Sequence, residues 1–297
     1  MPIHECRARV KPGLGPELDT FLSESEESSW MLLEDPIAGS TVLVGYFESE
    51  DEAGRAWSDL RGRVDDFLEA GPPVFSRLAD QDWKLSYREH FKAWRSGPVH
   101  WVPVWEKDTY QLPPGEVALW LDPGMAFGTG NHETTRLCLQ RMTDLVAEWR
   151  TVGRALESVG VIDAGCGSGI LALSAAALGL GPVRGFDLDP ESVVISRENA
   201  VLNSLADKVI FEQADLRSGL AGRQASLVLA NILANVLVEE KDALLTSIVP
   251  GGTLVLSGIL ATELAAVRTA FAGAAPGFGV SSRTMGEWAD LVLVRGS

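Results

Sequence analysis

Apolar and polar positions alternate in a regular way in the second half of the chain, where short apolar runs are followed by amphipathic stretches. Strands are expected at 160–164, 183–187, 208–213, 226–230 and 252–257, and helices at 169–179, 190–203, 233–247 and 261–272. Strands and helices in strict alternation predict a doubly wound α/β sheet. Two further apolar runs, 280–282 and 291–294, predict an antiparallel strand pair at one edge, around a loop that carries Trp288.

The first 70 residues follow a different order. Alternating positions predict strands, and apolar residues at helical spacing predict helices, the clearest being Ala53, Trp57, Leu60 and Val64. We expect strands at 3–10, 29–33, 41–47 and 82–87, with helices at 16–22 and 50–67. The order β-α-β-β-α-β predicts a small α+β domain of the ferredoxin-like type.

Prolines and tryptophans are frequent between these two regions. The prolines interrupt regular structure, so residues 71–115 are expected to form a linker. Trp83, Trp94, Trp101 and Trp105 lie close together in this stretch; we expect them to hold the linker against a domain, with nucleobase stacking as the alternative. The predicted division is a domain at 1–70, a linker at 71–115 and a second domain at 116–297.

The charge balance narrows the range of partners. The formal charge is −16 and the isoelectric point about 4.7, which disfavours direct binding to nucleic acid, because phosphates are neutralised by Lys and Arg. Such a surface suits a basic protein partner, although solubility alone also explains it. Three cysteines without metal-ligand spacing indicate a reducing compartment and no metal site. No signal-peptide core or membrane span is apparent, so we expect a cytoplasmic protein.

The strongest motif is V-I-D-A-G-C-G-S-G at 161–169, which ends a predicted strand and opens a predicted helix. Gly165 and Gly167 remove side chains where a ligand must approach the backbone. Asp187 ends the next strand, where a carboxylate can accept hydrogen bonds from ribose hydroxyls. The alternative is a tight strand-to-helix turn that binds nothing.

The glycine spacing distinguishes two classes of nucleoside site. A dinucleotide fingerprint needs G-x-G-x-x-G, but Ile170 occupies its third glycine position. The G-x-G-x-G spacing resembles the first motif of class I S-adenosylmethionine-dependent methyltransferases. That resemblance implies S-adenosyl-L-methionine as cofactor, a Rossmann-like sheet, and Asp187 as the residue that holds the ribose.

Two more segments resemble one family within this class. D-P-G-M-A-F-G-T-G-N-H-E-T-T begins at Asp122, and N-I-L-A begins at Asn231. Together they resemble the bacterial methyltransferases of large-subunit ribosomal protein eleven (PrmA). D-W-K-L-S-Y-R-E-H-F from Asp82, L-S-G-I-L from Leu256 and E-W-A-D-L from Glu287 extend the resemblance from about residue 80 to the end.

The resemblance implies a protein N-methyltransferase that modifies lysine side chains, the N-terminal amine, or both, of that ribosomal protein. It also implies that Thr135, Gly165, Asp187 and Asn231 contact S-adenosylmethionine. Glu133 departs from the family pattern, which carries a proline there. The N-terminal domain would then recognise the protein substrate. The sequence leaves the oligomeric state open, with a monomer as the default expectation.

Further roles follow from residue chemistry. Asn231 ends a buried strand with an amide that can position the incoming amine, unless it only forms a turn. Asp215 is a candidate for the adenine amino group. His132 is either a general base or a histidine that shapes the loop, and Phe127 either packs on the cofactor or packs only within the loop.

Three alternative functions share this scaffold. Enzymes that methylate amino groups of DNA or RNA commonly carry Asn/Asp-Pro-Pro-aromatic after the fourth strand, whereas this chain has Asn231-Ile-Leu-Ala. A methyltransferase of another protein or of a small molecule remains the main alternative. A module that binds S-adenosylmethionine without catalysis is the third.

Overall fold

The protein is described from a computed structural model that covers residues 3–25, 29–35, 40–78, 92–121 and 132–296. The chain divides into two compact units, residues 1–90 and 91–297. No helix in these ranges is long and apolar enough to cross a membrane.

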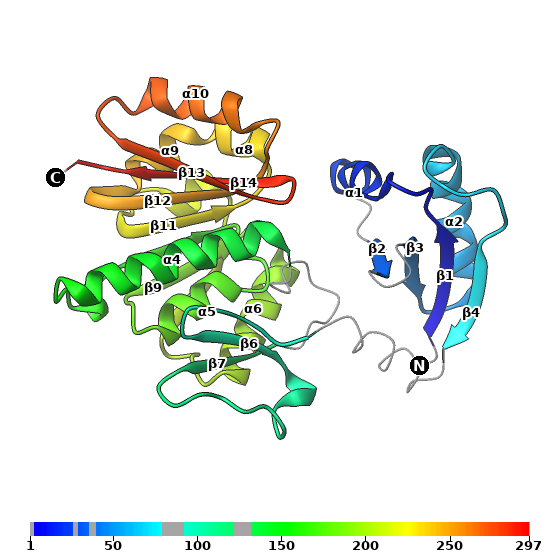
Figure 1. The fold of residues 1–297 in the computed structure, drawn as a ribbon, viewed down its shortest axis with the longest axis horizontal. Helices are drawn as coiled ribbons and strands as arrows, with labels where there is room; N and C mark the ends of the chain where they lie inside the picture. Colours follow the sequence, from blue (N-terminus) through cyan, green and yellow to red (C-terminus); the bar gives the residue numbers. More distant parts are fainter. Residues whose placement is uncertain (1–2, 26–28, 36–39, 79–91, 122–131, 297) are drawn as a thin grey trace. The chain divides into compact units, whose positions relative to one another are not determined.

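The N-terminal unit is a four-stranded antiparallel sheet with two helices (Figure 1). Its strand order, β2-β3-β1-β4, confirms the predicted ferredoxin-like topology. The elements are β1 (Ile3–Arg9), α1 (Gly15–Glu24), β2 (Trp30–Asp35), β3 (Ser40–Phe47), α2 (Glu50–Val64) and β4 (Val74–Leu78). The apolar stripe of α2 packs on Trp30, Leu43 and Phe47 of the sheet. The fourth strand is therefore β4, and the strand expected at 82–87 lies outside the described residues.

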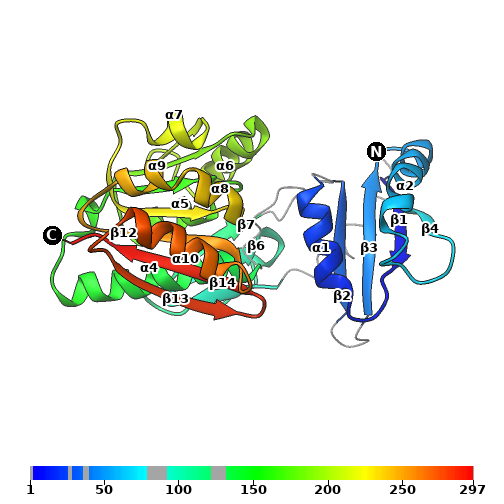
Figure 2. The ribbon, with the colours of Figure 1, turned by 90° about the horizontal axis from the view of Figure 1, so that it is seen from above.

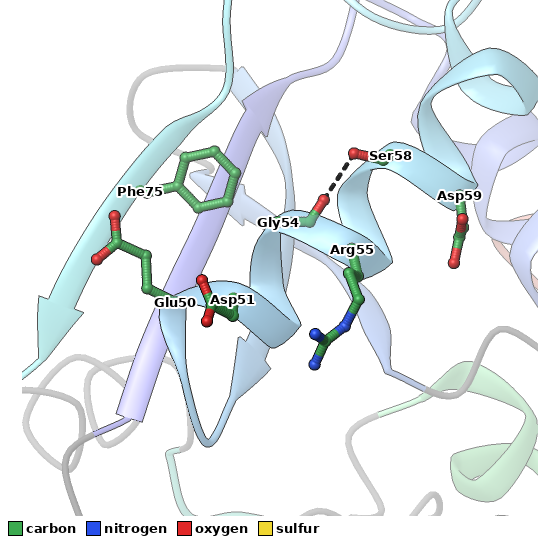
Figure 3. Close-up of a pocket in the computed structure, with 7 residues that line it drawn as sticks. All are labelled: Glu50, Asp51, Gly54, Arg55, Ser58, Asp59 and Phe75. Atoms are coloured by element: carbon green, nitrogen blue, oxygen red, sulfur yellow. Dashed lines mark hydrogen bonds between the residues drawn. The ribbon is translucent and has the colours of Figure 1, made fainter.

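Helix α2 begins with a well-formed cap. The Ser49 side chain accepts a hydrogen bond from the Glu52 backbone N–H, and the Glu52 carboxylate accepts one from Glu48 N–H. Acidic residues at Glu50 and Asp51 complement the positive end of the helix dipole. A shallow hollow lies between this end of α2 and Phe75 on β4 (Figure 3).

The C-terminal unit is built on a seven-stranded sheet of order β10-β9-β8-β11-β12-β14-β13. The strands are β8 (Val161–Ala164), β9 (Val183–Asp187), β10 (Val209–Gln213), β11 (Ala225–Asn231), β12 (Ile248–Leu260), β13 (Gly279–Met285) and β14 (Trp288–Val294). The first five are parallel, and β14 is antiparallel to both β12 and β13. This order confirms the Rossmann-like sheet with an antiparallel C-terminal pair.

Helices cover both faces of this sheet and create two cores. One core involves α4 (Glu133–Thr151), α5 (Ile170–Ala177) and α6 (Pro190–Leu202); the other involves α7 (Leu216–Leu220), α8 (Ala234–Glu239), α9 (Lys241–Thr246) and α10 (Leu264–Ala274). Figure 1 shows α8, α9 and α10 on one side of the strands and α4 on the other. The helix predicted at 233–247 is divided because the Glu240 backbone, at ψ 16°, leaves the helical region. An apolar pattern does not reveal a break at one residue.

The C-terminal strand pair differs from the prediction in one respect. Trp288 is not in a loop: it begins β14 and pairs with Leu260 of β12 and Met285 of β13. Only a two-residue turn, Gly286 and Glu287, separates the strands. Figure 2 shows the β13–β14 pair beside α4 and α10, in agreement with their contacts.

The stretch expected as a linker contains strands: β4 of the N-terminal sheet begins it, and two strands of a third sheet follow. The third sheet has the order β5-β6-β7, from β5 (Trp94–Ser96), β6 (Val99–Pro103) and β7 (Val117–Leu121), with short 3-10 turns at η1 (Val104–Glu106) and η2 (Leu156–Ser158) elsewhere in the unit. Trp94 stacks on Trp101 with ring centroids 4.3 Å apart, and the Trp101 indole donates to Ser174 Oγ on α5 at 3.1 Å. The Asn203 amide binds the Trp120 backbone N–H and carbonyl. Trp94 and Trp101 therefore pack in a core of the C-terminal unit.

Candidate functional site

Sheet register brings the ends of three strands to one level. Ala164 of β8 pairs with Phe186 of β9 on one side and with Ala230 of β11 on the other. The next residue on each strand is Gly165, Asp187 or Asn231. These three candidate residues therefore share the carboxyl edge of the sheet. Between β8 and β11 the strand order reverses, and α/β proteins bind ligands at such a switch point.

Two glycines of the loop, Gly165 and Gly169, are packed too closely to be replaced by a residue with a side chain. Gly165 has φ +75°, and a Cβ there would lie 2.5 Å from Ile232 Cγ2, just after β11. Gly169 has φ +79°, and its Cβ would lie 2.7 Å from the Phe211 ring on β10. Gly167 also has a positive φ, +50°. Backbone conformation and close packing both require glycine here.

Asp187 is held by two backbone donors. Its Oδ2 accepts a hydrogen bond from Gly167 N–H at 2.8 Å, and its Oδ1 accepts one from Asp189 N–H at 3.0 Å. An ionised carboxylate has about four acceptor positions, so each oxygen retains capacity for a ligand hydroxyl. A fixed carboxylate beside a glycine-rich loop fits a ribose and the adjoining part of a nucleoside.

Asn231 and Thr135 form a second hydrogen-bonded pair at this edge of the sheet. The Asn231 Nδ2 donates to Thr135 Oγ1 at 3.3 Å, and Thr135 is buried in the first turn of α4. Ser257 Oγ, next to Asn231 in register on β12, donates to the Thr134 carbonyl at 3.0 Å. Hydrogen bonds from β11 and β12 thus hold the N-terminal turn of α4 in place.

His132 caps this helix. Its Nδ1 lies 2.8 Å from Thr134 Oγ1 and accepts weakly from Thr134 N–H at 3.4 Å. Its ring packs edge-on against Trp288, with centroids 4.8 Å apart. These contacts favour the loop-shaping alternative over a general base, because the Nδ1 lone pair is engaged. Phe127 lies outside the described residues, as do the other residues of the glycine-rich segment up to Asn131.

Asp163 is a buried carboxyl group directly behind the glycine loop. Its Oδ2 accepts from Ala172 N–H at 3.0 Å, while Oδ1 has no hydrogen-bond partner among the described residues. Burial raises the pKa of Asp163 to about 7, against the Ala172 hydrogen bond, which lowers it. The sequence shows an acid on an apolar strand, but its unpaired oxygen becomes evident only in the fold.

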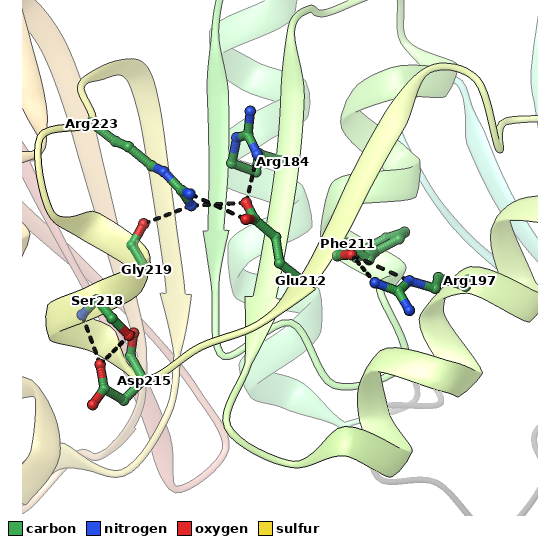
Figure 4. Close-up of polar contacts among 8 residues, drawn as sticks. All are labelled: Arg184, Arg197, Phe211, Glu212, Asp215, Ser218, Gly219 and Arg223. Carbon is green, nitrogen blue, oxygen red and sulfur yellow. Dashed lines mark hydrogen bonds and ion pairs between the residues drawn. The ribbon is translucent and has the colours of Figure 1, made fainter.

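Asp215 lies beyond the end of β10 and caps α7. Its Oδ1 accepts from Ser218 N–H at 2.7 Å and from Ser218 Oγ at 2.6 Å (Figure 4). These hydrogen bonds lower the pKa of Asp215. Nearby, Glu212 pairs with Arg184 of β9 and with Arg223, which also donates to the Gly219 carbonyl (Figure 4). Asp215 is therefore fixed to α7 and exposed, and is not hydrogen-bonded to the Gly167–Asp187 pair in this structure.

Neither metal ligands nor reactive thiols are found in the described part of the chain. No group of three His, Cys, Asp or Glu there could hold a metal ion. Cys6, Cys138 and Cys166 are free and buried, and burial raises the pKa of each thiol. Cys166 thus fills space between two loop glycines and is unsuited to nucleophilic attack.

Comparison with protein families gives a match over almost the whole chain. Residues 18–296 match the family described as Ribosomal protein L11 methyltransferase (PrmA). A ribosomal protein L11 methyltransferase from Geobacter sulfurreducens is 40% identical over 282 residues, which cover 93% of this chain and 86% of that protein. One from Trichlorobacter lovleyi is 40% identical over 226 residues, or 76% of this chain and 72% of that protein.

A solved structure agrees with these relatives. The ribosomal protein L11 methylase from Lactobacillus delbrueckii subsp. bulgaricus is 30% identical to this chain, with a TM-score of 0.59. The similarity covers 70% of this chain and 100% of that one.

Proposed function

This chain belongs to the ribosomal protein L11 methyltransferase family of S-adenosylmethionine-dependent enzymes, and we propose that it methylates amino groups of ribosomal protein L11. The proposal extends to lysine side chains, the N-terminal amine, or both. The observation that carries it is the shared edge of β8, β9 and β11, which joins the Gly167–Asp187 pair to the Asn231–Thr135 pair.

We assign the cofactor contacts to residues on this edge. Gly165 and Gly167 would face the cofactor through their backbone, and Asp187 would accept hydrogen bonds from the ribose hydroxyls. Thr135 and Asn231 would lie beside the methionine part. Asp215 remains a proposed partner of the adenine amino group, although reaching it would compete with its cap on α7.

The bound cofactor supplies an activated methyl group on a cationic sulfur. The protein's main contribution is then to align a neutral amine. Proximity and orientation can lower the activation free energy by several kcal/mol, with about 7–11 kcal/mol as the upper range. Lysine has a reference pKa of about 10.4. Desolvation in the site would lower that value and favour the neutral, nucleophilic amine.

We assign alignment of the amine to Asn231. Its N–H group is directed to Thr135 Oγ1, so its carbonyl oxygen can accept a hydrogen bond from the amine. An amide fixed in this way is preorganised. When the substrate amine donates an N–H to the Asn231 oxygen, the lone pair of the amine nitrogen is directed away from Asn231. Ala234, three residues on, is buried. It occupies the position at which nucleic-acid amino-methyltransferases carry an aromatic ring, which argues against a flipped-base substrate.

The N-terminal unit is the proposed substrate-recognition domain. The candidate cofactor and amine residues all belong to the C-terminal unit, whose two cores are self-contained. A separate domain with its own core is therefore available to bind protein. A cytoplasmic location and a monomeric state are also proposals; size-exclusion chromatography with light scattering would test the latter.

One alternative function uses the same residues. The alternative is methylation of another protein or of a small molecule, because residues that align an amine do not by themselves specify the molecule that carries it. Purified enzyme should be incubated with S-adenosylmethionine and with ribosomal protein L11, ribosomal RNA or free amino acids in parallel. Intact-mass and peptide mass spectrometry should then show +14 Da increments on L11 amines alone. Methylation of RNA or of amino acids, with L11 unmodified, would contradict the proposal.

A further inference from the structure

We propose that the hollow between α2 and β4 is the docking site for a basic, extended segment of the protein substrate. The inference rests on the proposed function, since it assumes that a basic ribosomal protein is the substrate. It adds a location on the N-terminal unit and a chemical character for the docking segment.

The floor of the hollow is apolar and lies at a sheet edge. It is formed by the ring of Phe75, which is 41% exposed and so remains open to solvent. β4 is the last strand in the order β2-β3-β1-β4, so no strand among the described residues pairs with its outer edge. Exposed edge strands with apolar side chains are a common place for an extended peptide to bind.

The wall of the hollow is open because of one glycine. Gly54 lies on the α2 face toward Phe75, and a Cβ built there would meet no atom within 4 Å. Figure 3 shows Gly54 on α2 among the residues that line the hollow. Glycine costs about 1 kcal/mol relative to alanine inside a helix. No clash in the described fold requires glycine here, so a need for space would explain it.

The rim is acidic. Glu50, Asp51 and Asp59 line it together with a single base, Arg55 (Figure 3). In residues 1–78, acidic side chains outnumber basic ones by more than two to one. Ribosomal proteins bind RNA, and contacts to phosphate require Lys and Arg. A lysine- or arginine-bearing segment with an apolar residue for Phe75 thus complements the rim and the floor, whereas RNA itself would be repelled.

The first test fills the hollow. Gly54→Trp should occupy the space over Phe75, while Gly62→Trp changes the same helix at another glycine with equal room. We expect Gly54→Trp to raise KM for full-length L11 about tenfold or more, with kcat and S-adenosylmethionine affinity unchanged. Gly62→Trp should leave all three values within about twofold, and thermal unfolding should show that both variants are folded.

The second test removes charge. Glu50→Gln/Asp59→Asn and the control Glu17→Gln/Asp66→Asn each remove two negative charges, and each includes one acid from the first turn of a helix. The hollow variant should raise KM for L11 about fivefold at low ionic strength, and the difference should shrink as salt screens the rim. The control variant should stay close to the wild type.

The outcomes separate the two proposals. If the wild-type enzyme does not methylate L11, the proposed function fails before any variant is compared. If the wild type methylates L11 but Gly54→Trp and Gly62→Trp have equal KM values, the hollow is not the docking site and the proposed function stands. Equal effects of the two charge variants would show that net charge, and not this rim, attracts the substrate.

Discussion

Asp187 shows how one side chain can be organised before a ligand arrives. Its carboxylate is oriented by Gly167 N–H and Asp189 N–H, so binding a ribose would require no rotation. Charge-assisted hydrogen bonds contribute about 1.5–3 kcal/mol each. Asp187→Ala should therefore weaken S-adenosylmethionine binding by about tenfold or more in calorimetry. Asp207→Ala, an exposed acid elsewhere in the unit, is the control; unchanged affinity in Asp187→Ala would contradict the ribose role.

Asp163 predicts a pH dependence of stability. Its pKa is about 7 in the fold, against 3.8 for the unperturbed group. Between these values the unfolded chain is ionised and the folded one protonated, so unfolding releases a proton. This residue's contribution to stability should fall as pH rises from about 4 to 7, by up to about 1.4 kcal/mol per pH unit, and remain low above pH 7.

Urea unfolding of the cofactor-free protein can isolate this effect. The difference in unfolding free energy between Asp163→Asn and the wild type should move in favour of the variant between pH 5 and 7, then level off. Other titrating groups are common to both proteins and cancel in the difference. A difference that does not vary with pH would show that Asp163 is ionised in the fold.

The candidate site was predictable from sequence where it depends on parallel-strand geometry. Residues that follow buried strands meet at one sheet edge, which is why Gly165, Asp187 and Asn231 could be placed together. The Asn231–Thr135 hydrogen bond and the cap made by His132 depend on where α4 packs. That position is set by contacts distant in sequence, so neither follows from local pattern.

At the scale of elements, α4 is fixed against the C-terminal strand pair by a buried ion pair. Arg141 donates two hydrogen bonds to Asp290 on β14, at 2.7 and 2.8 Å, and Asp290 is fully buried. Arg141→Ala would remove the guanidinium that neutralises this buried carboxylate, leaving it the Arg283 backbone N–H as a donor to Oδ1. It should lower the free energy of unfolding by about 3–5 kcal/mol.

The same two faces provide a matched control. Arg283 and Asp144 also join β13 to α4, but both side chains are substantially exposed. Because water screens such pairs, Arg283→Ala should cost at most about 1 kcal/mol. Denaturant unfolding of the two single variants measures the contrast directly. Similar losses would mean that burial does not govern the strength of these pairs.

The elements that sequence reasoning did not recover are those with weak local signals. β5 has only three residues, and β6 and β7 are separated by a proline-rich stretch. Their pairing depends on packing against α5 and α6, through Trp101 and Asn203. By contrast, β8 to β12 are apolar runs bounded by turns, and their existence could be predicted because both faces of a central parallel strand are buried.

For the whole molecule, the division into two units predicts separable functions. A truncated chain of residues 91–297 retains both cores of the C-terminal unit and should bind S-adenosylmethionine with wild-type affinity. Its KM for L11 should rise by about a hundredfold, because the proposed recognition surface is gone. Steady-state kinetics with intact L11 provides the measurement, and normal methylation by the truncated chain would show that the N-terminal unit is dispensable for recognition.

Because β14 lies between β12 and β13, the strands cannot join the sheet in the order in which they are synthesised. A ribosome releases residues 279–285 before residues 288–294, yet the earlier segment reaches the sheet only through the later one. During synthesis, β13 therefore cannot join the folded sheet until residues 288–294 have left the exit tunnel and formed β14. An enzyme proposed to modify a component of the translation machinery thus adds β13 to its sheet only after the strand that follows β13 in sequence has been synthesised.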